Sequence, residues 1–215
     1  MLVKARMTPN PVTVHEDTSM HEALRLMRER KVRRLPVLDT AGKLVGMVSE
    51  KDLLYASPSP ATSLSTFEIN YLIAQIKVAQ LMSKTLITVG EDTPLEEAAR
   101  IMVDNKVGGL PVLDTAGNLV GIITETDLFR IFLELLGARE RGLRLTLLVP
   151  DKRGMLASLA GAVAGLDGDI LALGTFSSQQ PGQALLAMKV RDVDRQALLD
   201  ALRTLGIEVV DVREA

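Results

Sequence analysis

Along the first quarter of the chain, stretches with a strand-like pattern of apolar residues alternate with stretches that have a helix-like pattern. Together they predict short strands and helices in a fixed order. Runs of β-branched and aliphatic residues predict strands, and apolar positions three and four apart predict amphipathic helices. The predicted strands are 12–14, 35–38 and 44–49, and the predicted helices are 19–30 and 50–55. Thr18 or Ser19 is placed to cap the first helix, with Glu22 completing a capping box. The resulting order is β-α-β-β-α.

The same order returns when Met82 is aligned with Met7, and the stretch 31–53 then matches the stretch 106–128 without a gap. A repeat this close predicts two copies of one structural unit, each covering an apolar face of the other. The second copy contains predicted strands at 87–89, 110–113 and 119–124 and predicted helices at 92–105 and 125–136.

The rest of the chain follows different patterns. Residues 56–66 are a connector rich in Pro, Ser and Thr, and 67–78 predict an apolar helix packed between the repeats or against a partner chain. After a charged hinge at 138–142, the order β-α-β-β-α-β predicts a ferredoxin-like domain. Its predicted strands are 143–149, 170–178, 183–191 and 208–212, and its predicted helices are 155–166 and 193–205. We therefore expect a mixed α/β (α+β) chain with domains at 1–60, 61–137 and 142–215.

Composition narrows the possible functions. Aromatic residues make up only 3% of the chain and the net charge is −2, which argues against binding to nucleic acid or an anionic membrane. There is no Cys, so disulfides and thiolate chemistry are excluded. The spacing of His15 and His21 fits no common metal-ligand pair. With no apolar run near the roughly 18 residues that a membrane span needs, we expect a soluble cytoplasmic protein without a metal.

Each repeat ends in a motif with two possible roles. Ser49 is followed three residues later by Asp52, and Thr124 by Asp127, in both cases where a strand gives way to a helix. The hydroxyl residue is suited to capping the helix, with the carboxylate near the positive end of the helix dipole. A carboxylate there is equally suited to accept hydrogen bonds from the two hydroxyls of a ribose. The residues alone leave both readings open.

The two repeats resemble CBS domains, which bind adenosyl nucleotides as tandem pairs. The resemblance rests on Leu-Pro-Val-Leu-Asp, on Gly-hydrophobic-hydrophobic-Ser/Thr-x-x-Asp, and on Asp-Thr-x-x-x-Glu-Ala at 17–23 and 92–98. It implies that the Ser/Thr and Asp residues hold a ribose, that nearby positions border the base, and that basic side chains meet phosphate. The nucleotide-site residues expected on this basis are Thr13, Arg33, Arg34, Leu35, Pro36, Ser49, Asp52, Thr88, Gly109, Leu110, Pro111, Thr124 and Asp127.

The two sites of the pair should differ. The first repeat has Arg33 and Arg34 where the second has Gly108 and Gly109. A guanidinium binds phosphate bidentately, whereas glycine only permits close approach of a backbone. We therefore expect Arg33 or Arg34 to supply phosphate recognition to one site, with a solvated basic corner as the alternative.

The first strand of the third domain ends in Val-Pro-Asp-Lys-Arg-Gly-Met-Leu at 149–156. On this motif the domain resembles ACT domains, which bind amino acids in many metabolic regulators or serve as pairing surfaces. The backbone amides of Gly154, Met155 and Leu156 open a helix and are suited to a carboxylate, and Asp151 to an amino group. The order CBS–CBS–ACT, with the segment between the repeats, resembles acetoin-utilisation proteins of the AcuB type.

The combined expectation is a non-catalytic regulator without a catalytic cofactor. It would bind AMP, ADP, ATP or S-adenosylmethionine in the CBS clefts, and an amino acid is a possible ligand of the ACT domain. It would form a homodimer and act on an unidentified metabolic protein. An enzyme of acetoin metabolism is one alternative, although no Gly-x-Gly-x-x-Gly motif follows a strand. A structural adaptor without a ligand is the other.

Overall fold

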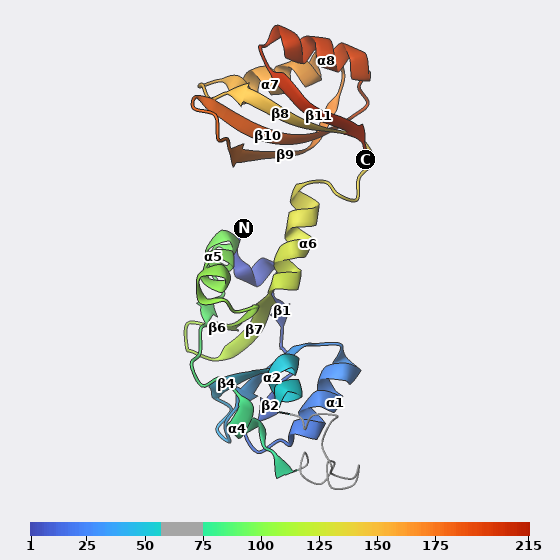
Figure 1. Ribbon diagram of the computed structural model, residues 1–215. Coiled ribbons are helices and arrows are strands. Elements are labelled where there is room, and N and C mark those ends of the chain that lie inside the picture. The colour runs from blue at the N-terminus through green and yellow to red at the C-terminus, as the bar shows by residue number, and fades with distance from the viewer. Residues whose placement is uncertain (57–74) are drawn as a thin grey trace. The chain divides into compact units, whose positions relative to one another are not determined.

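The computed structural model describes residues 1–56 and 75–215 and divides into two compact units, Met1–Leu128 and Phe129–Ala215. The predicted connector, apart from Ala56, and most of the predicted helix at 67–78 lie outside the described residues. The fold class is the mixed α/β arrangement that the sequence predicted (Figure 1). The predicted domain limits at 60, 61, 137 and 142 stay predictions.

The first repeat follows the predicted order. Its elements are β2 (Val14–His15), α1 (Met20–Arg30), β3 (Arg34–Leu38), β4 (Leu44–Ser49) and α2 (Glu50–Tyr55). Ser19 caps α1, because its hydroxyl accepts the backbone N–H of Glu22 at 3.2 Å. The helix ends where Lys31 adopts the left-handed conformation. The first strand is shorter than predicted, since it starts two residues later and ends one residue later.

The second repeat reproduces the first. Its elements are β5 (Val89–Gly90), α5 (Leu95–Asn105), β6 (Gly109–Leu113), β7 (Leu119–Thr124) and α6 (Glu125–Leu135), which continues into the second unit. Helix α5 starts later than predicted, since Pro94 precedes its first turn as the N-cap. Lys106 ends α5 in the left-handed conformation, as Lys31 ends α1. The left-handed C-cap is therefore repeated along with the apolar pattern, whereas the side-chain N-cap of α1 has no counterpart in α5.

The segment that precedes each repeat in the sequence packs on the other repeat. Strand β1 (Thr8–Pro9) pairs with β7 of the second repeat, and Ser83 forms the equivalent bridge with Met47 of the first. Helix η1 (Val3–Ala5) likewise packs on the second repeat, and helix α4 (Val78–Leu81) packs on the first. Val3 N–H donates to the carbonyl of Thr93 at 2.9 Å, for example. The sequence repeat did not predict this exchange, because the two leading segments are similar in sequence and either could pack on either repeat.

The glycine that opens the Gly-hydrophobic-hydrophobic-Ser/Thr motif makes this exchange possible. A Cβ on Gly46 would overlap Met82 Sδ, and a Cβ on Gly121 would overlap Met7 Sδ. The methionine of each exchanged segment therefore fills the space that the glycine leaves open, and Met82 is buried in the core of the first repeat.

The second unit has the predicted ferredoxin-like fold (Figure 1). Its elements are β8 (Leu143–Pro150), α7 (Met155–Ala164), β9 (Asp169–Ser177), β10 (Gln183–Arg191), α8 (Arg195–Thr204) and β11 (Glu208–Glu214). The strands are antiparallel in the order β11-β8-β10-β9, so the first and third strands of the domain are neighbours at the centre. Both helices contribute to one aliphatic core, which includes Leu145, Leu159, Met188 and Leu198.

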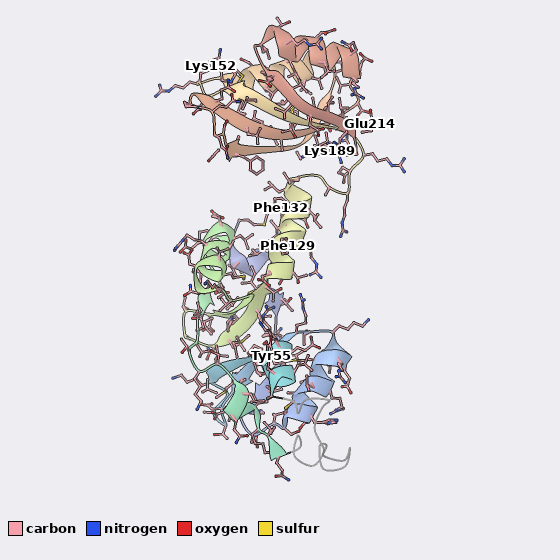
Figure 2. The ribbon with its side chains drawn as sticks, viewed as in Figure 1. Tyr55, Phe129, Phe132, Lys152, Lys189 and Glu214 are labelled. Atoms are coloured by element: carbon pink, nitrogen blue, oxygen red, sulfur yellow. The ribbon has the colours of Figure 1, made fainter. Side chains whose placement is uncertain are left out.

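The second unit also contains a buried cation. Lys189 on β10, labelled in Figure 2, is 4% exposed. Its Nζ donates to the carbonyl of Gly137 at 3.2 Å. Gly137 follows α6 with a φ of +57°, so this bond attaches the end of α6 to the sheet. Among the described residues, no helix is long and apolar enough to cross a membrane.

Candidate ligand-binding cleft

A cleft of about 480 Å³ lies within the first unit, between the two repeats. Residues of both repeats line it: Arg33, Arg34, Met47, Val48, Ser49, Glu50, Lys51, Asp52, Ser83, Lys106, Val107, Gly108, Gly109 and Glu125. Five of the predicted nucleotide-site residues are among them, namely Arg33, Arg34, Ser49, Asp52 and Gly109. The volume is within the usual range for small-molecule sites.

The remaining predicted residues do not line this cleft. The Leu-Pro pairs at 35–36 and 110–111 are buried in their strands, and Thr13 and Thr88 are half-buried just before β2 and β5. Thr124 and Asp127 lie at the equivalent place in the second repeat. The sequence motif therefore marks both repeats, whereas the described cleft is built on the first.

Ser49 and Asp52 form a capping box at the start of α2. The backbone N–H and the hydroxyl of Ser49 donate to Asp52 Oδ2 at 2.9 and 2.6 Å, and Ser49 Oγ accepts from the backbone N–H of Asp52. The capping role expected from the sequence is thus confirmed. A carboxylate has acceptor sites on both oxygens, so capping through Oδ2 is compatible with a further role for this group in the cleft.

The second repeat has the same local bonds in a different environment. Asp127 Oδ2 accepts from the backbone N–H and the hydroxyl of Thr124 at 2.9 and 2.7 Å. Asp127 is only 8% exposed, however, whereas Asp52 is exposed. The two carboxylates therefore accept the same pair of bonds from the preceding hydroxyl residue but differ in how easily a ligand reaches them.

The two arginines contact the second repeat. Arg34 Nη2 lies 3.5 Å from Glu125 Oε2, and Arg33 Nη2 donates to Thr126 Oγ1 at 3.3 Å. A Cβ on Gly108 would overlap the guanidinium of Arg34 and lie 2.5 Å from Glu125 Oε2. The glycine therefore makes room for the arginine of the other repeat. This differs from the sequence-based view, in which the glycines and arginines acted in separate sites.

Sequence reasoning missed two cations of the cleft. Lys51 lies within the motif itself, and its Nζ is 5.4 Å from the centre of the Tyr55 ring. Lys106 is the left-handed residue that ends α5. The signal for Lys51 was its place between Ser49 and Asp52, but Lys106 reaches the cleft only because the second repeat is folded against the first. Among the described residues, no group of three metal-ligating side chains is found.

The predicted amino-acid site of the second unit lies where β8 turns into α7. Gly154 has a φ of +84° and precedes α7, and the N–H of Asp151 donates to the carbonyl of Gly182 at 2.9 Å. Met155 is buried and its N–H donates to the carbonyl of Lys152 at 3.3 Å, while Leu156 is exposed. One of the three amides expected to receive a carboxylate is thus bonded within the turn. Binding of an amino acid here stays a prediction.

The fold and the cleft define a class of protein. Residues 3–59 and 78–134 match the CBS domain family, and residues 141–213 match the TTHA0829-like ACT domain family. The chain therefore belongs to the CBS-domain proteins, as a tandem CBS pair followed by an ACT domain. The resemblances stated from the sequence are confirmed.

Solved structures of similar proteins give this class more detail. CBSX2 of Arabidopsis thaliana, solved in complex with AMP, is 38% identical with a TM-score of 0.50, over 61% of this chain and 96% of that one. The CBS pair of protein MJ0100, solved with 5′-methylthioadenosine and S-adenosyl-L-methionine, is 28% identical with a TM-score of 0.52, over 65% and 98%. A Vibrio cholerae protein designated as acetoin utilization protein AcuB is 31% identical with a TM-score of 0.52, over 65% and 95%.

Proposed function

We propose that the cleft built on Ser49 and Asp52 binds an adenosyl ligand, either AMP, ADP, ATP or S-adenosylmethionine, and that the chain is a non-catalytic regulator. The observation that carries the proposal is the cleft itself, in which an exposed carboxylate at a helix start faces cations from both repeats. The ligands present in the structures of CBSX2 and MJ0100 support the choice of an adenosyl group.

The lining residues suggest how such a ligand would be divided among them. The ribose hydroxyls would donate to Asp52, which takes two donors well when ionised. The base would contact the apolar side chains of Met47 and Val107, which line the cleft and are only partly buried, in place of the buried Leu-Pro pairs. A phosphate would be drawn to the cations that line the cleft: Arg33, Arg34, Lys51 and Lys106.

The regulatory part of the proposal concerns the rest of the chain. A ligand held by both repeats would shift the equilibrium between different arrangements of the two repeats. It would do so only to the extent that it binds one arrangement better than another. We extend the proposal to a cytoplasmic homodimer in which the ACT domain pairs or binds an amino acid through Asp151, Gly154, Met155 and Leu156. The regulated partner would be a metabolic protein, with acetoin utilisation suggested by the likeness to the AcuB protein.

The first test is calorimetry and thermal unfolding of the full chain with AMP, ADP, ATP and S-adenosylmethionine. A ligand present at 100 times its dissociation constant stabilises the folded state by about 2.7 kcal/mol. Asp52→Asn should weaken binding by about tenfold or more, because a charge-assisted hydrogen bond is lost. Asparagine still offers an oxygen to the backbone N–H of Ser49, so α2 should remain capped.

The matched control is Asp39→Asn. Like Asp52, Asp39 accepts two local hydrogen bonds, in its case from the backbone N–H groups of Ala41 and Lys43 at 2.9 and 2.8 Å, but in a turn that does not line the cleft. Its substitution should leave ligand affinity unchanged. If none of the four ligands stabilises the protein, the proposal is wrong and a ligand-free adaptor is favoured. Reduction of diacetyl by NADH, lost on a point mutation, would favour an enzyme of acetoin metabolism instead.

A further inference from the structure

We propose that Glu125 determines whether the cleft prefers anionic or neutral adenosyl ligands, because it competes with the ligand for Arg34. The inference rests on the proposed function and adds to it a residue that no sequence motif indicated. Arg34 opens β3 of the first repeat, and Glu125 is the first residue of α6 in the second. Both side chains line the cleft and meet across the repeats at 3.5 Å.

The space for this contact is specific to one side of the pair. Gly108 occupies the position equivalent to Arg33, and a side chain there would overlap both the guanidinium of Arg34 and the carboxylate of Glu125. Glu50 is the equivalent of Glu125 and lines the same cleft. Among residues 1–56 and 75–215, the acidic partner of Arg34 is nevertheless Glu125. Of these two equivalent carboxylates, the one that meets Arg34 is therefore that of the second repeat.

The contact is suited to exchange with a ligand. The side chain of Arg34 is 26% exposed and that of Glu125 is 53% exposed, and pairs this open to solvent contribute little to stability. A ligand phosphate can form two parallel hydrogen bonds with a guanidinium, which the single 3.5 Å contact does not. Glu125 would therefore act as a built-in substitute for the ligand anion, and an arriving phosphate must displace it against like-charge repulsion.

The measurement is isothermal calorimetry of the full chain with AMP and with 5′-methylthioadenosine, which keeps the adenine and the ribose 2′ and 3′ hydroxyls but has a neutral methylthio group in place of the phosphate. In Glu125→Gln, AMP should bind about fivefold tighter, because Arg34 is released and one repelling charge is removed. The affinity for 5′-methylthioadenosine should change much less. Glu50→Gln removes the same charge from the same cleft without releasing Arg34, and its gain for AMP should be clearly smaller.

A double-mutant cycle isolates the contribution of Arg34. In an Arg34→Gln background, Glu125→Gln should no longer tighten AMP beyond the gain seen for Glu50→Gln. The inference is overturned if the gain persists in that background, if Glu50→Gln gives an equal gain, or if 5′-methylthioadenosine gains as much as AMP. If the wild-type chain binds neither probe and none of ADP, ATP and S-adenosylmethionine, the proposed function fails and this inference fails with it. If both probes bind and the affinity for each probe is the same in every variant, the inference is overturned while the proposed function stands.

Discussion

Replacing Gly108 with alanine should separate Arg34 from Glu125 at almost no cost to the stability of the first unit. The new Cβ would overlap the guanidinium of Arg34 and approach Glu125 Oε2 to 2.5 Å. The guanidinium is the far end of a flexible side chain, so it can move away while the strands stay in place. Gly108 does not have a positive φ, and alanine is therefore free of backbone strain at this position.

The expected change in the free energy of unfolding is the balance of two opposing contributions. Loss of the exposed ion pair costs at most about 1 kcal/mol, and the smaller backbone entropy of alanine in the unfolded chain returns about 0.4–1 kcal/mol. We expect the free energy of unfolding of the first unit to change by less than about 1 kcal/mol. Urea titration followed by circular dichroism, with the two units fitted separately, measures it. A loss above about 2 kcal/mol would refute the reasoning, since it would mean that Arg34 is held rigidly.

Three further predictions concern packing and charge. Gly46→Ala should destabilise the first unit by about 1–3 kcal/mol in the same titration, because its Cβ would overlap the buried Met82 Sδ. When it is made in a Met82→Ala background, the same substitution should cost less. Lys189→Ala should destabilise the second unit by about 1–3 kcal/mol in chemical denaturation, since a buried carbonyl loses its charged donor. Arg213 holds the pKa of Asp211 below its usual value, so Asp211 stabilises the folded state above about pH 4 and this contribution is lost as the pH falls further. Asp211→Asn should therefore flatten the acid side of the thermal stability profile, and an unchanged profile would contradict the assignment.

Much of the fold was predictable because the relevant forces act between residues close in sequence. The strand and helix limits around Leu44–Ser49, Glu50–Tyr55 and Gln183–Arg191 were predicted as observed, since alternation, caps and turn residues all agreed there. The capping role of Ser49 and Asp52 was also readable, because its hydrogen bonds span only three residues. The family resemblances followed from the same local motifs.

The site itself was only partly predictable. The residues Ser49, Asp52, Arg33 and Arg34 were expected to matter, and the structure places all four at one cleft. The Leu-Pro pairs were expected at the base but are buried. Leu35 packs in the core of the first repeat, and Pro36, whose side chain points to the other face of the strand, is covered as well. Lys106 was missed, since nothing near it in the sequence shows which residues it faces.

The sequence by itself determined the repeated units, their local caps and the order of the third domain. The tertiary structure decided which leading segment docks on which repeat, and it brought Arg34 to Gly108 and Glu125. The physical reason is that two near-identical repeats offer near-identical docking surfaces, so local patterns cannot distinguish exchange from its absence. That choice is made only when the two repeats pack against each other, and in the packed pair the two carboxylates of the motif differ in exposure.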